Sequence, residues 1–411
     1  MPSADVQLRE RVRRLPGMEL LLPALEGLPP AYLVGGAVRD LLRGADAVDL
    51  DIAVEGDARS VARAVAERLS GEAREHERFG TATVRADELS FDLATTRTET
   101  YDEPGALPRV SPAALDEDLS RRDFAINAMA VGLTGDDLGH LYDPCGGLGD
   151  LGDGVVRVLH ARSFVEDPTR LLRAVRYEVR LGFRMDPGTE TLARAAAADG
   201  ALRTVSGARV RDELMDLLGE AQAPAGVGRM RDLGLDRAMH PALSADPELV
   251  ASASLGAAAI GADPALAALA ALCVRAPRRL ERWLGDLHLT AANRDGVARA
   301  VHVAPRLARE LRTREHQASQ LRALLGAEPT VALALAMALG APHDPIVRWV
   351  TELRSVRLEI TGDDLLAAGV PEGPGLGRAL DETLNLKLDG LVSGRDEELE
   401  TALAVAGERT R

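Results

Sequence analysis

Two neighbouring runs of sequence decide the fold at the start of this chain: Leu33-Val34-Gly35-Gly36-Ala37-Val38-Arg39-Asp40 and Val48-Asp49-Leu50-Asp51-Ile52-Ala53-Val54. In the first run an apolar strand ends at a glycine pair that opens a helix. In the second run side chains alternate between the two faces of a strand. Val48, Leu50, Ile52 and Val54 are therefore expected on the buried face, with Asp49 and Asp51 together on the other. The order strand, glycine turn, helix, strand predicts a domain of mixed α and β structure.

The two aspartates of the second run predict a metal site. Hard cations such as Mg²⁺ prefer oxygen ligands, and two such ions about 3.5–4 Å apart activate an attacking hydroxyl and stabilise a departing pyrophosphate. A third carboxylate is expected from a neighbouring strand, and Asp92 in Phe91-Asp92-Leu93 fits because its apolar neighbours should point inward. The alternative is a solvated strand edge that happens to carry two acids.

The glycine turn predicts a cradle for a triphosphate and so favours the metal site. Gly35 and Gly36 let the backbone approach phosphate oxygens, the helix start presents unpaired N–H groups, and Arg39 adds a charged donor. A glycine pair is more often an ordinary tight turn. A phosphate cradle and a carboxylate pair in tandem, however, indicate nucleotide chemistry.

A second segment, Arg121-Arg122-Asp123-Phe124-Ala125-Ile126-Asn127, falls within a helix predicted over Asp116–Ala130. Asn127 follows Asp123 by four residues, which places both on one helical face. We expect Arg122 to contact a phosphate, and Asp123 and Asn127 to position a sugar. A charged helix entry with ordinary capping is the alternative.

A third segment, Glu166-Asp167-Pro168-Thr169-Arg170-Leu171-Leu172-Arg173-Ala174-Val175-Arg176-Tyr177, opens a helix with Pro168 in its first turn. Five arginines fall within about a third of the helix circumference: Arg170, Arg173, Arg176, Arg180 and Arg184. A solvated face usually mixes acids with bases, so this stripe is interpreted as facing an anion.

Asp167 and Arg170 suggest how a base is chosen. Cytosine and adenine both present an amino donor beside a ring-nitrogen acceptor, whereas guanine and uracil present the opposite order. A carboxylate only accepts and a guanidinium only donates, so the pair matches C and A. A wrong base would leave buried groups unpaired, at roughly 1–3 kcal/mol for each contact. A weak surface ion pair is the alternative.

The bulk properties narrow the functional class. A formal net charge of −15 over 411 residues argues against a nucleic-acid partner unless basic residues cluster. They do: seven Arg against three acids lie in residues 155–184, and ten Arg against five acids in residues 275–315. The two cysteines, Cys145 and Cys273, favour a reducing cytoplasm over a disulfide framework. Neither a signal sequence nor an apolar run of about 18 residues is evident, so no membrane partner is expected.

Periodicity predicts an αβ head followed by an all-helical remainder. In the head, strands are expected at Ala31–Val34, Val48–Val54, Thr81–Arg85 and Leu89–Ala94, and helices at Val38–Arg43 and Ala58–Leu69. Asp102–Ser111, with two prolines and a glycine, predicts a mobile loop. From Phe164 onward the pattern is helical, with breaks near Asp186–Gly188, Ala221–Gly226, Ala262–Pro264 and Gly340–Pro345.

Together these segments resemble the class II tRNA nucleotidyltransferase (CCA-adding enzyme) and bacterial poly(A) polymerase family, a branch of the polymerase-β-like nucleotidyltransferases. The likeness covers Tyr32–Arg184, including Phe79-Gly80-Thr81 and Asp92-Leu93-Ala94-Thr95-Thr96-Arg97, and returns at Ile360–Leu366 and Gly373–Arg378. It implies an α+β fold: a head with a small mixed sheet at residues 1–150, a neck at 151–222, a helical body at 223–340 and a helical tail at 341–411. Body and tail would hold the acceptor and T arms of tRNA.

The resemblance also implies CTP and ATP as substrates and Mg²⁺ as cofactor. Asp49 and Asp51 would bind the metal, with Asp92 at the position of the third carboxylate. The residues expected to contact the incoming nucleotide are Gly35, Gly36, Arg39, Arg122, Asp123, Asn127, Asp167, Arg170, Arg173 and Arg176. In the family, an acid and a base in the loop after Arg97 help the enzyme switch from C to A, and Asp102 or Glu103 with Arg109 would serve here.

Several functions stay open at this point. The chain is expected to complete CCA on tRNA, but it could be a partial enzyme adding only CC or only A, or a poly(A) polymerase. From a different class comes a non-catalytic RNA-binding protein that kept the scaffold. The intact Asp49, Asp51 and Asp92 and the arginine stripe favour an enzyme.

Overall fold

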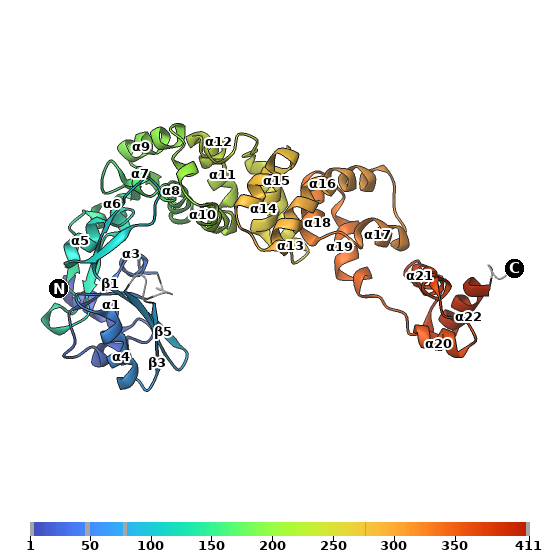
Figure 1. The fold of residues 1–411 in the computed structure, drawn as a ribbon, viewed down its shortest axis with the longest axis horizontal. Helices are drawn as coiled ribbons and strands as arrows, with labels where there is room; N and C mark the ends of the chain where they lie inside the picture. The colour runs from blue at the N-terminus through green and yellow to red at the C-terminus, as the bar shows by residue number, and fades with distance from the viewer. Residues whose placement is uncertain (1–3, 46–49, 77–79, 276, 408–411) are drawn as a thin grey trace. The chain divides into compact units, whose positions relative to one another are not determined.

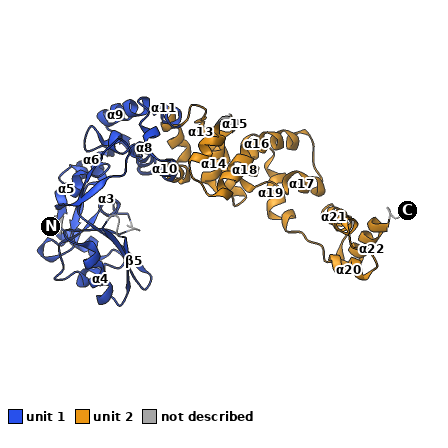
Figure 2. Ribbon diagram, in the orientation of Figure 1, with its two compact units in different colours: residues 1–213, 232–239 blue, residues 214–231, 240–411 orange. Residues whose placement is uncertain are grey.

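The computed structural model describes residues 4–45, 50–76, 80–275 and 277–407. The chain divides into two compact units, Met1–Glu213 with Asp232–Met239 and Leu214–Arg231 with His240–Arg411 (Figure 2). The first unit contains the mixed sheet and the second is helical (Figure 1). The predicted α+β head with an all-helical continuation is confirmed. The finer division into head, neck, body and tail stays a prediction.

A seven-stranded sheet forms the centre of the first unit, in the order β3-β4-β5-β2-β1-β8-β9. Its strands are β1 (Ala31–Val34), β2 (Asp51–Val54), β3 (Glu72–His76), β4 (Thr81–Ala86), β5 (Leu89–Thr95), β8 (Ala130–Gly132) and β9 (Leu141–Tyr142). Strands β2 and β5 run parallel and the other neighbours are antiparallel. The parallel pairing matters for the site because its register sets Asp51 opposite Asp92.

The alternation predicted for the second decisive run is confirmed for the part of it that the structure describes. Leu50, Ile52 and Val54 are buried in the main core, and Asp51 is exposed. Val48 and Asp49 lie outside the described residues, and the described strand begins at Asp51. On the face that carries Asp51, Ala53 joins a smaller core cluster with Tyr32, Val34, Leu115, Leu119 and Ala130.

Helices cover the sheet and position the glycine turn. The helices of this region are α1 (Ala4–Arg13), α2 (Met18–Ala24), α3 (Gly36–Arg43), α4 (Ala58–Arg68), α5 (Leu115–Ser120) and α6 (Gly147–Asp153). Helix α4 packs on β3, β4 and β5 (Figure 1). It begins where the side chain of Asp57 accepts the Arg59 N–H at 3.2 Å, an ordinary N-cap.

The helix predicted over Asp116–Ala130 is wrong beyond Ser120. Helix α5 ends there, a 3₁₀ turn η2 spans Ala125–Asn127, and Ala130 begins β8. Pairing with a distant segment overrides the local periodicity, because the Ala125 N–H donates to the Arg157 carbonyl at 2.9 Å and Phe124 pairs with Val158. The turn nevertheless brings Asn127 back to Asp123.

The segment predicted as a loop over Asp102–Ser111 contains part of a strand. Strands β6 (Arg97–Thr100) and β7 (Arg109–Pro112) form a two-stranded hairpin, with Thr98 opposite Ser111 and Thr100 opposite Arg109. This pairing shows no alternation of apolar and polar residues, so periodicity could not reveal it. The connection 101–108 remains irregular, as the prolines and glycine predict.

The arginine-rich helix is α8 (Arg170–Leu181), and it ends earlier than the predicted stripe. Gly182 at φ 69° closes the helix in the left-handed conformation that favours glycine. Arg184 therefore lies not on the helix but in β11 (Arg184–Met185), which pairs in parallel with β10 (Val155–Val156). The other elements of this region are η3 (Gly135–Asp137), α7 (Ser163–Glu166), α9 (Pro187–Ala198), η4 (Ala201–Thr204), α10 (Gly207–Gly219), α11 (Ala223–Leu233) and α12 (Leu235–Met239).

Helices make up the second unit. Besides residues 214–219 of α10 and 223–231 of α11, they are α13 (Pro247–Ala259), α14 (Pro264–Cys273), α15 (Pro277–Asp286), α16 (Ala291–Thr313), α17 (Ala318–Leu325), α18 (Thr330–Ala338), α19 (His343–Thr351), η5 (Leu353–Ser355), α20 (Gly362–Ala367), α21 (Pro374–Leu388) and α22 (Gly394–Gly407). Helices α13, α14, α16 and α18 pack together, and α14 is buried from Ala265 to Cys273. A separate apolar cluster holds α20, α21 and α22 through Ile360, Leu365, Ala379 and Ala402.

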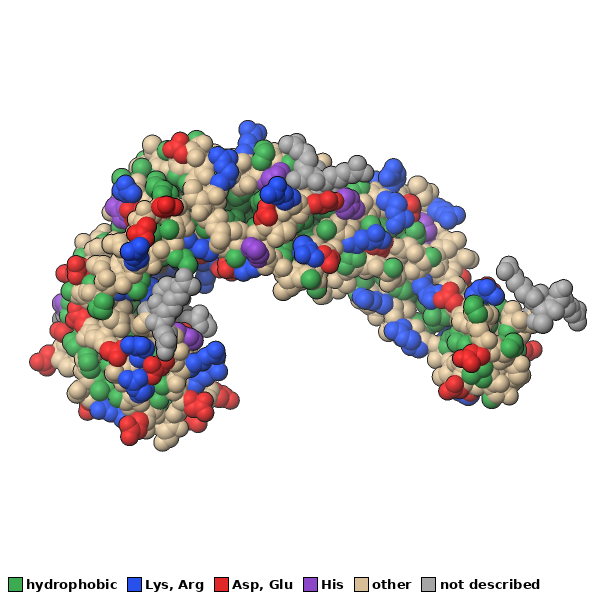
Figure 3. Space-filling model, in the orientation of Figure 1, with side chains coloured by type: hydrophobic (Ala, Val, Ile, Leu, Met, Phe, Trp, Pro, Cys, Tyr) green, Lys and Arg blue, Asp and Glu red, His purple; other side chains and the backbone are tan. Residues whose placement is uncertain are grey.

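The predicted breaks near Asp186–Gly188 and Ala262–Pro264 are helix starts with a shared chemistry, and a start at Asp246 that was not predicted has it too. Helices α9, α13 and α14 each begin with an aspartate cap followed by proline, at Asp186, Asp246 and Asp263. The aspartate accepts backbone N–H groups of the first turn, and proline there has no N–H to satisfy. In Figure 3, basic and acidic side chains are interspersed over the visible described surface of both units.

No single described helix is both long and apolar enough to cross a membrane, although the bent pair Ala318–Leu325 and Thr330–Ala338 passes that test by length and composition.

Candidate active site

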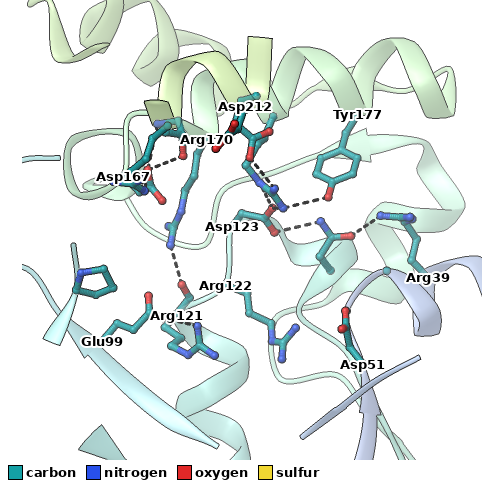
Figure 4. A pocket seen from close by; sticks show the side chains of 18 of the residues that line it. Arg39, Asp51, Glu99, Arg121, Arg122, Asp123, Asp167, Arg170, Tyr177 and Asp212 are labelled. Carbon is teal, nitrogen blue, oxygen red and sulfur yellow. Dashed lines mark hydrogen bonds and ion pairs between the residues drawn. The ribbon is translucent and has the colours of Figure 1, made fainter. Parts of the chain in front are cut away.

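A pocket of about 710 Å³ in the first unit brings most of the predicted site residues together (Figure 4). The predicted residues that line it are Gly35, Gly36, Arg39, Asp51, Arg122, Asp123, Asn127, Asp167, Arg170 and Arg173. Three predicted residues are not among those that line it. Asp49 is outside the described residues, Asp92 lines an adjacent cavity, and the buried Arg176 approaches Glu213 at 3.5 Å.

The glycine turn is shaped to approach a ligand closely. Gly35 has φ 70° and ψ −134°, a conformation that side chains rarely adopt, and α3 begins at the next residue. A Cβ added to Gly35 would lie 3.0 Å from Arg122 Nη1, so the conformation favours glycine and a side chain there would crowd this guanidinium. The turn thus places the start of α3 beside a guanidinium, an arrangement suited to an anion.

Arg39 is held firmly at this turn. Its side chain is almost fully buried and donates from Nε and Nη2 to Asp40 at 2.9 and 2.8 Å and from Nη1 to Asn127 Oδ1 at 2.7 Å. Its guanidinium also lies 5.3 Å from the centre of the Tyr177 ring, within the range of cation–π attraction. Burial opposes its charge, but the bonds and charge of Asp40 outweigh that effect and raise the pKa of Arg39.

A chain of hydrogen bonds links Arg39 to α8 and α10, and we call it the buried network. Asn127 Nδ2 donates to Asp123 Oδ1 at 3.1 Å, and Arg173 donates to Asp123 Oδ2 from Nη2 at 2.7 Å and from Nε at 3.0 Å. Arg173 Nη1 also donates to Glu213 Oε1 at 3.0 Å. Figure 4 shows part of this chain crossing the pocket wall. It fixes residues from four sequence segments with respect to one another.

The buried network determines the charge of its central carboxylate. Burial opposes ionisation of Asp123, but the charge and hydrogen bonds of Arg173 and the bond from Asn127 outweigh burial and lower the pKa of Asp123. Burial also opposes the charge of Arg173, and Asp123, Tyr177 and Glu213 together raise its pKa. Both groups therefore stay ionised as a pair.

Asp51 and Asp92 come from adjacent parallel strands in register. Neighbouring strands lie about 4.7–4.9 Å apart, so carboxylates at one register position and on one face can share ligands. Both side chains are exposed, and Asp92 Oδ1 accepts a hydrogen bond from Thr83 Oγ1 at 2.6 Å. Two oxygen ligands of this kind suit a hard divalent cation.

A second buried carboxylate, Asp118, holds the two arginines that lie between the glycine turn and the carboxylates. Arg121 Nη2 donates to Asp118 Oδ1 at 2.6 Å, and Arg122 Nη2 donates to Asp118 Oδ2 at 2.9 Å. Burial opposes the charge of Asp118, yet the two guanidiniums lower its pKa. Arg121 also donates to Glu99 at 2.6 Å. Arg122 is thereby aimed at Gly35, where phosphate contact was predicted.

Asp167 and Arg170 both line the pocket, and each is held by a residue that sequence analysis did not identify. Asp167 Oδ1 accepts from the Thr169 backbone and hydroxyl at 3.1 and 2.6 Å and pairs with Arg209 at 2.8 Å. Arg170 donates to Ser163 Oγ at 2.7 Å and to the Arg121 carbonyl at 2.8 Å. These contacts of Asp167 all use its Oδ1 atom.

Sequence analysis missed several further residues of the pocket. They are Glu99, Tyr101, Tyr177, Arg209, Asp212 and Glu213. Arg180 also lines the pocket, as its place in the predicted arginine stripe indicated. The spacing of Arg209 and Glu213 on one face of α10 was a signal, but an i,i+4 acid–base pair is common on surface helices. No sequence pattern pointed to Tyr101. Its hydroxyl donates to Glu99 at 2.9 Å, and burial together with the charge of Glu99 raises the pKa of Tyr101.

Family models match two parts of the chain. Residues 31–157 match the poly A polymerase head domain, and residues 182–246 match a probable RNA- and SrmB-binding site of polymerase A. A CC-adding tRNA nucleotidyltransferase of Deinococcus radiodurans is 33% identical over 91% of this chain and 89% of its own length. The chain belongs to the tRNA nucleotidyltransferase and poly(A) polymerase family.

Other members of the family are similar over nearly the whole chain. An A-adding tRNA nucleotidyltransferase of Geobacter sulfurreducens is 36% identical over 92% of this chain and 45% of its own length. A CCA-adding enzyme in complex with CTP has a TM-score of 0.81 at 30% identity, covering 99% of both chains. The Thermotoga maritima CCA-adding enzyme with tRNA has a TM-score of 0.79 at 29% identity, covering 98% of both. The chain spans less than half the length of the A-adding relatives from Geobacter, Halalkalibacterium and Aquifex that it matches.

Proposed function

We propose that this chain transfers CMP and AMP from CTP and ATP to the 3′ end of tRNA and releases pyrophosphate. The observation that carries the proposal is the register of Asp51 with Asp92 beside a pocket lined by Arg39, Arg122 and Arg170. An acidic pair next to an arginine-lined pocket suits a nucleoside triphosphate with its metal ions. The reaction would be transfer of a nucleotidyl group to a hydroxyl. The enzyme would work in the cytoplasm.

The triphosphate would lie against the glycine turn. Gly35 and Gly36 allow close approach of backbone N–H groups, and Arg122 reaches the same place from the opposite wall. Arg39 uses three of its five N–H donors on Asp40 and Asn127, so it would add its charge, its hold on the turn and its remaining donors to phosphate binding. Asp123 and Asn127 line the pocket, and they would bind the sugar with the parts of their side chains that face it.

Asp49, Asp51 and Asp92 would hold Mg²⁺. When bound, two such ions make the attacking hydroxyl a better nucleophile and the pyrophosphate a better leaving group. The sheet would hold the carboxylates side by side, because Asp51 and Asp92 are paired across neighbouring strands. The hydrogen bond from Thr83 would fix one oxygen of Asp92 in place. Carboxylate oxygens favour a hard divalent ion, and we propose that this ion is Mg²⁺.

Base choice would rest on Asp167 and Arg170. Oδ2 of Asp167 would accept the amino hydrogen of cytosine or adenine, and Arg170 would donate to the ring nitrogen. Arg170 uses two of its five N–H donors on Ser163 and the Arg121 carbonyl, so donors remain for a base. Arg173 and Arg176 would act through the buried network by holding Asp123 and Glu213 rather than by touching the base.

The experiment is incorporation of each labelled NTP into three tRNAs, ending just before CCA, after its second C, and after its A. We expect CMP on the first, AMP on the second and nothing on the third. AMP alone on the second tRNA would identify an A-adding enzyme, and CMP alone on the first a CC-adding enzyme. Repeated AMP addition to the third would identify a poly(A) polymerase. No incorporation into any of them would leave a non-catalytic RNA-binding protein.

The root of the proposal is tested by Asp51→Asn. Incorporation should fall by about a thousandfold or more, roughly 4 kcal/mol of transition-state stabilisation, with the circular dichroism spectrum unchanged. The matched control is Asp87→Asn, which changes an exposed aspartate in the β4–β5 turn of the same sheet. Equal activity of Asp51→Asn and Asp87→Asn would end the proposal.

A further inference from the structure

A groove of about 910 Å³ lies on the first unit, apart from the arginine-lined pocket. It is bounded by α2, by the loop that follows α2, and by the connection from β8 to β9. Among the described residues, none lines both this groove and the arginine-lined pocket. Strand β1 separates the two places, because Pro30 before the strand lines the groove and Gly35 after it lines the pocket. The groove is therefore not a part of the nucleotide site.

Apolar side chains form the floor of the groove and are continuous with the main core of the sheet. Met18 and Leu25 line it and are fully buried in that core. Three leucines that also line it pack against the core but remain partly exposed: Leu22, Leu28 and Leu138. An apolar group of a ligand would remove the rest of their surface from water, which is favourable. The floor therefore suits an apolar side chain from a partner.

The rim of the groove is acidic. Four exposed acids line it against one arginine, Arg13, which is already paired within α1. The four are Glu19, Glu26, Asp136 and Asp137. In the part of the chain that the structure describes, Glu19, Glu26 and Asp136 form no ion pair. An excess of acidic side chains attracts cations and repels phosphate groups.

We propose that this acid-rimmed groove binds a basic, amphipathic segment of another protein. Leucine-like side chains of the partner would cover the floor, and its arginine or lysine side chains would pair with the rim. An amphipathic helix presents apolar residues at every third or fourth position with charged residues beside them, and apolar grooves recognise helices by that spacing. Nucleic acids and anionic membranes are disfavoured as occupants because both present phosphates to the acidic rim.

The groove is independent of the catalytic groups. The match to the poly A polymerase head domain begins at residue 31, whereas α2 and Glu26 precede that residue. A partner bound there would touch neither Asp51 and Asp92 nor the glycine turn. The inference therefore goes beyond the proposed function, and either of them can fail without the other.

The first test uses a defined probe with the full chain. The probe is a fluorescein-labelled peptide of twelve leucine and arginine residues, with the leucines on one helical face, and its binding is measured by anisotropy. A second peptide has glutamate in place of every arginine, and a third has the leucines spread over all faces. We expect the first peptide to bind roughly tenfold or more tightly than either of the others. Equal binding of the first and third peptides would overturn the inference.

Removing the charge of the rim should weaken binding of the first peptide roughly tenfold or more. The variant is Glu19→Gln/Glu26→Gln/Asp136→Asn. A matched control removes three exposed acids elsewhere on the first unit: Glu67→Gln/Glu72→Gln/Glu88→Gln. The control measures the general attraction between an acidic protein and a basic peptide. Equal weakening by both triple variants would mean that the groove is not the binding site.

The floor is tested by shortening one leucine. Leu22→Ala should weaken peptide binding roughly fivefold without changing its dependence on salt, because the lost contact is apolar. The matched control is Leu20→Ala, since Leu20 lies on the same helix, is 42% exposed and does not line the groove. CTP affinity, measured by equilibrium titration, should be unchanged in both variants and shows that they are folded. Equal peptide affinity of the two variants would remove the floor from the site.

Two further measurements separate a protein partner from RNA. With the first peptide bound, amide hydrogen exchange should slow within residues 18–28 and 133–138. Protection confined to α8 or α16 would overturn the inference. The rim variant should also keep the KM for tRNA of the unmodified protein. A KM raised roughly tenfold would assign the groove to RNA and likewise overturn the inference, while leaving the proposed function intact.

Discussion

The charged groups of the two units are arranged differently. In the buried network of the first unit, Arg39 and Asp123 are less than a tenth exposed and each bonds to other members of the network. In the second unit, the pairs Arg306–Glu310 and Arg348–Glu352 lie on the surface, with side chains 40–47% and 54–68% exposed. Lys387 with the buried Glu398 is an exception there.

This difference separates charged residues whose position depends on a buried partner from charged residues that water alone could solvate. A buried charge loses its hydration, so it is stable only where a partner compensates for that loss. A surface ion pair replaces some contacts with water by a weak, screened attraction, so it contributes little to the stability of the fold. The buried network therefore marks the site even without a bound ligand, while the surface pairs of the second unit mark solvent or an RNA backbone.

The largest expected effect comes from breaking the buried network at its centre. Asp123→Ala removes the acceptor of Arg173 and leaves that guanidinium buried without its partner, so unfolding of the first unit should become easier by about 3–5 kcal/mol. Urea unfolding followed by circular dichroism measures the change. Asp123→Asn, which keeps an acceptor oxygen and the shape, should be less damaging. A loss below about 1 kcal/mol in Asp123→Ala would break the comparison between the units.

The same carboxylate gives a pH dependence of known sign. Because the fold lowers the pKa of Asp123, its contribution to stability is present above the ordinary pKa of an aspartate and is lost as pH falls through the lower, folded value. The stability difference between the unmodified protein and Asp123→Asn should therefore shrink on acidification below about pH 4. Thermal unfolding of both proteins between pH 3 and 7 measures it. A difference that grows toward acid would contradict the assignment of the pair as ionised.

How far the sequence predicted this network differs from residue to residue. The glycine turn, Asp51, Asp92 and α8 followed from strand alternation and helical spacing, which are local patterns. The partners could not be predicted because they come from afar: Arg173 meets Asp123 across 50 residues, and Arg209 meets Asp167 across 42. The helix predicted through Ala130 was wrong for the same reason, since Arg157 takes the backbone bond that periodicity had assigned locally.

An intermediate effect is expected where the pocket meets the base. Asp167→Ala should relax base choice by about tenfold, because the wrong bases no longer face an unpaired carboxylate. The measurement is kcat/KM for CTP and for UTP on tRNA lacking CCA. Glu166→Ala is the matched control, since this neighbouring acid bonds to Arg162 instead of lining the pocket. An equal loss for all four nucleotides in Asp167→Ala would count against selection by hydrogen-bond pattern.

The arginines of α16 in the second unit should show a smaller effect, and one of a different kind. Replacing Arg306, Arg309 and Arg312 by Gln removes three charges from one helix. Arg306 also pairs with Glu310 and the buried Glu328, and Arg312 donates to the Leu339 carbonyl, so the fold of the variant is checked by circular dichroism. If this surface faces an RNA backbone, the KM for tRNA rises and the slope of log affinity against log salt falls by up to about three. CTP affinity should stay unchanged. A salt slope equal to that of the unmodified protein would remove α16 from the RNA surface.

The smallest effect is expected at an isolated surface pair. Arg348 Nε on α19 lies 3.8 Å from Glu352, the residue that follows the helix, and both side chains are more than half exposed. Arg348→Gln should lower stability by no more than about 0.5 kcal/mol, and added salt should erase even that difference. Urea unfolding at low and high salt measures both quantities. A loss as large as that of Asp123→Ala would mean that exposure does not separate the two kinds of pair, and burial could then no longer be used to locate the site.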